Sequence, residues 1–414
     1  TGIVKRQVLR LSVASWESYV ETLPTLQNAW ITSVKRSKNL PSLVDEGSAP
    51  LTSIRALCAA IAISVRISKK VANQNVGLLL PSSGGAALAN MGSLLAGKAV
   101  VNLNYTSNLS DITSACETAE IKVIVTSNTF LKKLKARGID IRTAFQGQEL
   151  IYLEELVREI PKIELGLYWL TVKLLPESFV RLLYSHHNDT DKIAAILFSS
   201  GSEGSPKGIS LTHKNIMSNI KQVAEIVNAK PDDVMMGSLP LFHAFGLTVT
   251  TLLPLIEGIP LVCQPDPTDA LSTAKSISRH GVSIMCGTSS LLRLYTQNQK
   301  IHPLLLVSLR LVVSGAEKLD DRVRQDFQVK FGKAILEGYG TTETAPVATC
   351  NLPDQLEPSR LKIQKGSQLG TVGMPVPGTT CIIVDPETFE ELPIGDAGMV
   401  LIGGPQVMHG YVGE

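Results

Sequence analysis

A Ser/Gly-rich loop closed by a single lysine carries the clearest chemical signal in this chain of 414 residues. It belongs to the run LFSSGSEGSPKG, which starts at Leu197, and lies between a strand-like run, Ile193–Phe198, and a helix-like run, Asn215–Val227. Small residues let backbone N–H groups approach an anion, while hydroxyls and an ammonium add donors and positive charge. The residues expected to cradle a polyphosphate are Ser199, Ser200, Gly201, Ser202, Glu203, Gly204 and Lys207.

This loop is not a Walker A motif, in which Gly-Lys precedes Ser or Thr, because Lys207 follows Pro206 and precedes Gly208. The alternative is a flexible polar loop, but a run that ends in Pro-Lys-Gly after a strand favours the anion site. Glu203 is unusual in such a place, because a carboxylate repels phosphate unless it points outward or helps to hold a metal ion. Both orientations stay open.

A second group of polar and small residues follows two predicted strands, Leu309–Val313 and Lys333–Leu336, which a polar helix starting at Asp320 connects. In such a βαβ unit both loops leave the carboxyl ends of parallel strands, where open α/β sheets bind ligands. One wall of a flat slot for a purine is then expected after the first strand and the other after the second. The residues expected there are Gly315, Ala316, Glu317, Gly338, Tyr339, Gly340, Thr341 and Thr342.

Two of the residues after the second strand offer further chemistry. Thr342 provides a hydroxyl for a phosphate, and Glu343 provides a carboxylate for Mg²⁺, a hard cation that prefers oxygen ligands. Alone, the Gly-Tyr-Gly run reads as a turn and Glu343 as a solvated acid. Together with the Ser/Gly-rich loop, they indicate a site for a magnesium-bound nucleotide.

Strand-like and helix-like runs alternate from Ala72 onward, which predicts an α/β protein with largely parallel sheets. We expect two packed αβ-layered subdomains, 71–230 and 231–365, after a lead-in with helices over 1–70. Short runs with Gly/Pro turns predict a small β-rich subdomain over 366–414. The predicted strands are Val76–Leu80, Ala99–Leu103, Lys122–Thr126, Ile193–Phe198, Val234–Ser238, Pro260–Cys263, Ser283–Cys286, Leu309–Val313 and Lys333–Leu336.

Composition narrows the classes of protein that fit. A hydrophobic content of 44%, a charged content of 18% and a net charge of +2 indicate a well-cored globular protein and do not favour nucleic acid as a partner. The six cysteines lie far apart, which favours buried free thiols in a reducing cytosol. No long uncharged apolar run predicts a membrane-spanning helix. The stretch 163–184 would be amphipathic as a helix, packed on its own domain or against a membrane surface.

The motifs resemble a known superfamily. Ser-Gly-Ser-Glu-Gly-Ser-Pro-Lys-Gly from Ser200, Tyr-Gly-Thr-Thr-Glu from Tyr339 and the pair Gly410-Tyr411 look like those of adenylate-forming enzymes. That superfamily includes acyl-CoA synthetases, luciferases and peptide-synthetase adenylation domains. LPLFHAFGLTV from Leu239 and Glu203, where most members carry Thr, resemble a narrower group. This group is the synthetase part of bacterial bifunctional 2-acylglycerophosphoethanolamine acyltransferase/acyl-[acyl-carrier-protein] synthetases.

The resemblance implies an AMP-forming ligase that uses ATP and Mg²⁺. A fatty carboxylate attacks the α-phosphate of ATP, and a thiol then takes the acyl group from the acyl-adenylate. Residues 199–207 would hold the β- and γ-phosphates, Thr342 the α-phosphate and Glu343 the Mg²⁺. Gly315, Ala316 and Tyr339 would hold adenine. His243 would lie beside the acyl pocket, although a histidine at a helix start is an equal alternative.

The acceptor implied by the resemblance is acyl carrier protein, in the service of lysophospholipid reacylation. Coenzyme A is the alternative, and a non-catalytic acyl- or nucleotide-binding module is an alternative of another class. The implied location is the cytoplasm, with the cytoplasmic face of the inner membrane as a variant. The superfamily's ribose-binding aspartate and C-terminal catalytic lysine would lie beyond Glu414, so we expect this chain to adenylate poorly by itself. A His-x4-Asp match at His186–Asp191 is expected to be a chance occurrence.

Overall fold

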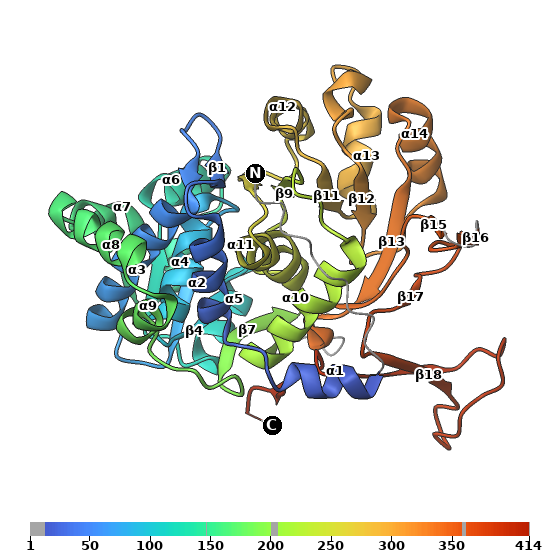
Figure 1. The fold of residues 1–414 in the computed structure, drawn as a ribbon, viewed down its shortest axis with the longest axis horizontal. Coiled ribbons are helices and arrows are strands. Elements are labelled where there is room, and N and C mark those ends of the chain that lie inside the picture. The colour runs from blue at the N-terminus through green and yellow to red at the C-terminus, as the bar shows by residue number, and fades with distance from the viewer. Residues whose placement is uncertain (1–12, 146, 200–205, 358–361, 414) are drawn as a thin grey trace.

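Two large sheets organise the protein (Figure 1). The computed structural model describes residues 13–145, 147–199, 206–357 and 362–413. The first sheet has seven strands, and its five central and outer strands are parallel. Two antiparallel strands, β8 and β20, close its other edge. In spatial order the strands are β20 (Gly410–Tyr411), β8 (Lys207–Thr212), β7 (Ile193–Ser199), β4 (Ala99–Asn102), β3 (Asn75–Leu79), β5 (Val123–Thr126) and β6 (Glu149–Tyr152).

The second sheet has nine strands, of which the central six are parallel. Antiparallel strands close both edges. In spatial order the strands are β17 (Met374–Pro375), β14 (Val347–Cys350), β13 (Ile335–Gly340), β12 (Leu311–Ser314), β11 (Ile284–Gly287), β9 (Met235–Gly237), β10 (Leu261–Cys263), β1 (Pro41–Asp45) and β2 (Leu51–Thr52). Two further hairpins stand apart from the large sheets: β15 (Gln355–Glu357) with β16 (Lys362–Gln364), and β18 (Thr380–Val384) with β19 (Met399–Gly403).

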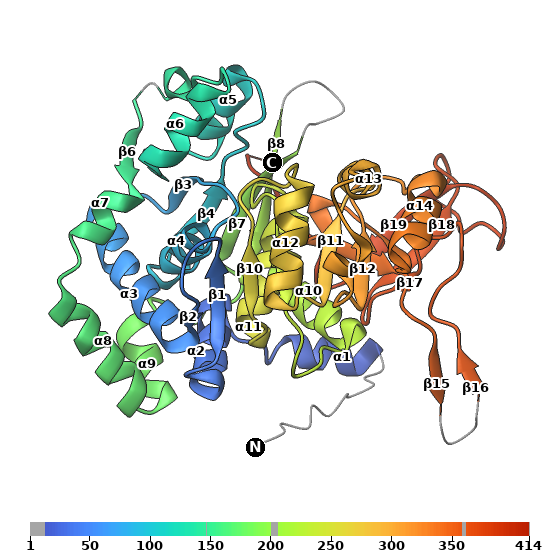
Figure 2. The same cartoon turned by 90° about the horizontal axis from the view of Figure 1, so that it is seen from above.

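Helices cover the sheets in layers (Figure 2). The largest hydrophobic cluster joins the facing sides of the two sheets through α2 (Leu26–Ser37), α3 (Ser53–Lys70), α4 (Gly84–Leu95), α10 (His213–Val227), η2 (Phe245–Leu252) and α11 (Leu253–Glu257). A second cluster packs α12 (Ala270–His280), α13 (Ser289–Gln297), η3 (Pro303–Leu306) and α14 (Asp321–Phe331) on the outer face of the nine-stranded sheet. A third packs α5 (Leu109–Thr118), α6 (Asn128–Ala136) and η1 (Ile141–Ala144) on the other face of the seven-stranded sheet.

Further helices lie at the periphery. They are α1 (Val13–Val20), α7 (Leu153–Arg158), α8 (Lys162–Leu174) and α9 (Glu177–Tyr184). The short η4 (Thr342–Thr344) follows β13 and contacts β8. The stretch 163–184 is therefore two helices rather than one, because Pro176 cannot continue α8. Among the described residues, no helix is both long and apolar enough to cross a bilayer.

The structure confirms the predicted α/β class with largely parallel sheets, and a small β-rich part follows in β18 and β19. Each predicted strand overlaps an observed one, because continuous apolar runs of this length mark strands buried on both faces. The subdomain boundaries at 70, 230 and 365 stay predictions. Strand β1, from the predicted lead-in, pairs with β10 in the nine-stranded sheet, and β20 pairs with β8 in the seven-stranded sheet.

A buried histidine begins α10 and joins it to α2. The Leu26 backbone N–H donates to His213 Nδ1 at 3.3 Å, and the His187 ring lies 5.1 Å from the His213 ring. Burial, with smaller contributions from His187 and Lys192, lowers the pKa of His213 to about 3. The folded protein therefore keeps this imidazole neutral at pH values where the unfolded chain binds a proton.

We predict a loss of stability in weak acid that depends on His213. Because the folded-state pKa lies below the unfolded value, the free energy of unfolding falls as pH drops below about 6.5. The contribution between about pH 7.5 and about pH 5.5 is about 1.4 kcal/mol. Urea unfolding should show this loss in the wild type and in the exposed control His302→Gln, but not in His213→Gln. An equal loss in all three proteins would contradict the assignment.

Candidate functional site

The strands on either side of the predicted phosphate loop pair with each other. Strands β7 and β8 pair antiparallel, with Ser199 opposite Lys207. The expected change from strand directly to helix at this loop was wrong, because Gly208–Thr212 continues as a strand before α10 begins. The alternation of apolar Ile209 and Leu211 with polar residues was the available signal. The predicted residues Ser200, Gly201, Ser202, Glu203 and Gly204 lie outside the described residues.

The Gly410-Tyr411 pair lies beside the second of these strands. Strand β20 pairs antiparallel with β8, and the Val412 backbone N–H donates to the Gly208 carbonyl at 2.8 Å. This pairing places the Tyr411 ring 5.4 Å from Lys207 Nζ, within the range of a cation–π interaction. Strand β20 thereby brings an aromatic ring next to the lysine that closes the predicted phosphate loop.

Glu343 reaches the same tyrosine from the other sheet. The Tyr411 hydroxyl donates to Glu343 Oε1 at 3.2 Å, and the Met408 backbone N–H donates to the Glu343 carbonyl at 2.7 Å. The turn that carries Glu343 is held by a capping box, in which Thr341 and Thr344 exchange side-chain and backbone hydrogen bonds. Lys207, Tyr411 and Glu343 therefore form one group assembled from three distant segments.

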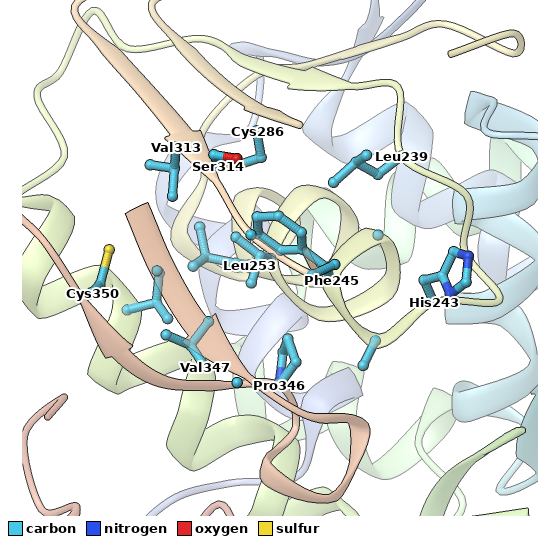
Figure 3. Close-up of a pocket in the computed structure, with 18 of the residues that line it drawn as sticks. Leu239, His243, Phe245, Leu253, Cys286, Val313, Ser314, Pro346, Val347 and Cys350 are labelled. Atoms are coloured by element: carbon cyan, nitrogen blue, oxygen red, sulfur yellow. The ribbon is translucent and has the colours of Figure 1, made fainter. Parts of the chain in front are cut away.

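A cavity of about 290 Å³ adjoins this group (Figure 3). Its lining is mainly apolar and comes from α10, η2, α11 and strands β9, β11, β12, β13 and β14. Thr288, Thr341 and Thr342 are among the polar residues that line it. The wall includes Leu239, Phe245, Val249, Leu253, Ile284 and Val313. A cavity with apolar walls and a few polar groups is the usual form of a site for a small molecule that carries a hydrocarbon part.

Most of the predicted nucleotide residues lie on this cavity. They are Gly315, Ala316, Gly338, Tyr339, Gly340, Thr341 and Thr342. The first two follow β12, the next three form the end of β13 (Ile335–Gly340), and the two threonines follow it. Strands β12 and β13 pair in parallel, as expected from the βαβ pattern. The Tyr339 side chain is exposed. Ser314, just before Gly315, is fully buried beside the cavity, and its hydroxyl has no hydrogen-bond partner among the described residues.

Glu317, which was predicted beside the nucleotide, lies beside the start of α13. It is not among the residues that line the cavity, and its carboxylate accepts a hydrogen bond of 2.5 Å from the Ser290 backbone N–H at the start of α13. Burial opposes ionisation there, but hydrogen bonds from Ser290 and Thr288 outweigh it and hold the pKa of Glu317 below its usual value. An acid at this position stabilises the helix start, because the first turn of a helix has unpaired N–H groups.

Two glycines allow the close backbone approaches that shape the cavity. A Cβ on Gly246 would lie 2.0 Å from the Pro240 carbonyl oxygen, so only glycine lets η2 start against this segment. A Cβ on Gly340 would lie 1.8 Å from the Pro346 carbonyl oxygen. The contact of Gly246 with Pro240 fixes the start of η2, where Phe245 lies. Figure 3 shows the Phe245 ring between the β12 side of the cavity and Val347.

His243 lies at the border of the cavity, apart from the apolar side chains around Phe245 (Figure 3). Its ring is accessible to solvent yet surrounded by protein on other sides, and this desolvation lowers its pKa. The neutral ring has one donor and one acceptor nitrogen, so it can form hydrogen bonds at the border of the cavity. Its ring centroid lies 4.6 Å from that of Phe242.

Sequence reasoning left out two residues that the structure brings into the site. Tyr411 served only as a marker of resemblance, although its pairing with β8 places it beside Lys207 and Glu343. Phe245, which lines the cavity, lay within the run LPLFHAFGLTV but received no role. In the described part of the chain, no group of three or more His, Cys, Asp or Glu side chains is arranged to hold a metal ion. A cation at Glu343 would therefore need oxygen ligands from a bound phosphate.

Curated proteins similar to this chain are acyl- and aryl-CoA ligases by name. A 4-coumarate–CoA ligase of Pinus taeda is 28% identical over 363 residues, which are 84% of this chain and 64% of that protein. A long-chain-fatty-acid–CoA ligase of Yersinia pestis is 29% identical over 355 residues, 81% of this chain and 61% of that protein. The chain thus spans about three fifths of the length of the curated relatives that it matches.

Solved structures share the fold. Apo MatB from Rhodopseudomonas palustris superposes with a TM-score of 0.74 at 22% identity, over 94% of this chain and 72% of that chain. The anthranilate CoA ligase AuaEII in complex with anthranoyl-AMP gives a TM-score of 0.77 at 20% identity, over 95% of this chain and 72% of that chain. The family described as AMP-binding enzyme matches residues 34–412, almost the whole length. This chain therefore belongs to the AMP-binding enzyme family.

Proposed function

We propose that this protein activates a fatty acid with ATP, through an acyl-adenylate, and passes the acyl group to a thiol. The observation that carries the proposal is the apolar cavity of about 290 Å³, which has Thr342 on its border. The next residue, Glu343, belongs to the group formed with Tyr411 and Lys207. A hydrocarbon chain in the cavity would thus have its carboxylate close to residues suited to phosphate and metal.

The first step needs two anions to be held together. A carboxylate oxygen of the fatty acid attacks the α-phosphorus of ATP, and the bond to the β-phosphate breaks to release pyrophosphate. Catalysis then depends on positioning and charge neutralisation. In this proposal Lys207 and the loop from Ser199 to Gly204 hold the β- and γ-phosphates, and the Thr342 hydroxyl binds the α-phosphate.

The adenine would lie between Gly315-Ala316 and Tyr339, which line the cavity from adjacent strands. The buried Ser314 hydroxyl fits this use, because a ligand could supply the hydrogen-bond partner that the described residues do not. Glu343 would hold Mg²⁺, which supplies positive charge against the phosphates. A single carboxylate fits a cation that takes most of its ligands from phosphate oxygens and water.

The thiol acceptor in the proposal is acyl carrier protein, from the narrower resemblance around Glu203 and the run from Leu239. Coenzyme A is a second candidate, because the curated relatives carry CoA ligase names. Thioester formation assayed with both acceptors side by side decides between them. The proposed location is the cytoplasm, with the inner face of the membrane as the place where a fatty acid would be met.

Fatty-acid-dependent exchange of pyrophosphate into ATP tests the activity. We expect exchange with a long-chain fatty acid, weak for this chain by itself, and none with acetate, because only a long chain fills the cavity. Equal exchange with 4-coumarate would contradict the fatty-acid assignment. Binding of Mg-ATP without exchange for any carboxylate, also in a protein extended beyond Glu414, would favour a non-catalytic binding module instead.

We predict that Glu343→Gln weakens magnesium-dependent binding of ATP by about tenfold to a hundredfold, because it removes a charged oxygen ligand without changing the shape. Isothermal titration with ATP, with and without MgCl₂, measures this effect. The exposed Glu117→Gln serves as the matched control. If magnesium strengthens ATP binding equally in both variants, Glu343 does not hold the metal.

We predict a smaller effect of Tyr411→Phe. This change removes the hydrogen bond to Glu343 but keeps the ring beside Lys207, so the apparent affinity for Mg²⁺ should fall by about threefold to tenfold. The KM for the fatty acid should not change, because Tyr411 is not among the residues that line the cavity. Tyr411→Leu should weaken ATP binding further. Wild-type magnesium dependence in both variants would contradict a positioning role.

A further inference from the structure

Two peripheral helices, α8 and α9, form a hairpin between β6 and β7, far from the cavity. They lie on the outside of the molecule beside α3, at the end away from β15, β16 and β18 (Figures 1 and 2). The proposed ligase function gives this hairpin no role. Its surface chemistry, however, differs from that of an ordinary solvated helix pair.

The outward face of α8 is apolar. Ile163, Leu167, Leu170 and Leu174 follow one another at helical spacing, and their side chains are 84%, 58%, 46% and 66% exposed. Residues spaced by four, three and four share one face of a helix. The opposite face is the packed one, because Tyr168 and Val172 are buried. A surface helix normally turns its apolar stripe toward the core, so this second stripe needs a partner.

The second helix extends the same surface. Phe179, Leu182 and Leu183 on α9 are 54%, 77% and 55% exposed, while Val180 is buried against the body. Pro176 separates the two helices, so each can present its own apolar face. We call these seven exposed residues of α8 and α9 the hairpin face.

The acidic and the basic side chains of the hairpin differ in their contacts. Both carboxylates of the two helices are tied down: Arg66 Nη2 donates to Glu164 Oε2 at 2.7 Å, and Arg181 lies 2.5 Å from Glu177. Glu177 also accepts a hydrogen bond of 2.8 Å from the Thr32 hydroxyl on α2. Lys162 and Lys173 are exposed, and the structure gives neither an ion pair with another described residue.

The two lysines share a row with an exposed tryptophan. Lys162, Gly166, Trp169 and Lys173 repeat the spacing of the apolar stripe and lie along one flank of it. Lys173 Nζ lies 4.2 Å from the centroid of the Trp169 ring. An apolar stripe bordered by lysine and tryptophan is the pattern of a helix that lies in a membrane interface.

The hairpin is held firmly on the body. Lys35 of α2 donates hydrogen bonds to the Leu175 carbonyl at 2.5 Å and to the Val172 carbonyl, so it caps the end of α8. Exposed apolar side chains on a fixed support meet a surface with little further loss of conformational freedom.

We propose that the hairpin face docks the protein on an anionic lipid bilayer. The seven apolar side chains enter the boundary between headgroups and acyl chains, and Lys162, Lys173 and Trp169 lie at the level of the phosphates. A second copy of the chain fits less well, because Glu164 and Glu177 are already paired with arginines, so the hairpin of another copy would offer the lysines no free carboxylate. The described helices are too short or too polar to span the bilayer, so the hairpin lies on it.

Tryptophan fluorescence gives a direct test on the whole chain. Of the three tryptophans, Trp16 and Trp30 are buried at 2% and 0% exposure, so a change on adding vesicles reports Trp169. We expect a blue shift with phosphatidylcholine vesicles that contain phosphatidylglycerol, and quenching when the lipids carry brominated acyl chains. Pure phosphatidylcholine should give a weaker response, and added salt should reduce binding.

Two double variants separate the apolar from the electrostatic contribution to vesicle binding. Phe179→Ser with Leu182→Ser should weaken vesicle binding at least about tenfold, because it removes two large apolar groups from the interface. Lys162→Gln with Lys173→Gln should weaken binding to phosphatidylglycerol vesicles about fivefold per lysine, with little effect on pure phosphatidylcholine. Leu304→Ser with Val307→Ser is the control, because these side chains, on η3 and directly after it, are 67% and 64% exposed.

Two outcomes would overturn the proposal. One is the absence of any spectral change or sedimentation with vesicles for a wild type that is folded by circular dichroism. The other is sedimentation velocity that shows a dimer abolished by the Phe179/Leu182 variant, which would assign the face to a second copy. Neither result bears on the ligase activity, because the exchange assay reports the cavity and not the hairpin.

Discussion

The pairing of β20 with β8 is the contact on which the candidate site depends. It brings Tyr411 beside Lys207, the residue that closes the predicted phosphate loop, and the same tyrosine hydrogen-bonds Glu343 from the other sheet. Tyr411 thus links β8, which carries Lys207, to the turn at η4, which carries Glu343. A positive charge and a carboxylate are thus held close together through one aromatic ring, as a magnesium-bound polyphosphate requires.

The apolar half of the site has a different origin. The two sheets face each other across α10, η2 and α11, and the cavity is a gap in this shared core. Gly246 lets η2 approach the Leu239-Pro240 segment, and η2 in turn places Phe245 in the cavity. The hydrocarbon binding that we propose would therefore use the same packing that holds the sheets together. A change that fills the cavity alters both the volume open to an acyl chain and the packing of its walls.

Sequence reasoning located the strands well because buried parallel strands are short apolar runs bounded by Gly and polar residues. It also predicted that Gly315, Ala316 and Tyr339 through Thr342 lie near one another, because the βαβ rule fixes where such loops emerge, and these residues line one cavity. Their role in nucleotide binding stays a prediction. Sequence reasoning missed β8, since Lys207–Thr212 was absorbed into a loop, and it expected Glu317 at the nucleotide although this acid bonds the start of α13. The meeting of Tyr411 with Lys207 depends on long-range pairing, which no local pattern encodes.

The central claim is that one cavity joins a nucleotide end to a hydrocarbon end. Calorimetric titration with sulfamoyl-adenosine analogues that carry alkyl chains of increasing length tests it directly. We predict that affinity rises by up to about fourfold for each added methylene until the cavity is full, because each buried methylene adds hydrophobic free energy. An affinity that does not depend on chain length, and that equals the affinity for AMP, would contradict the claim.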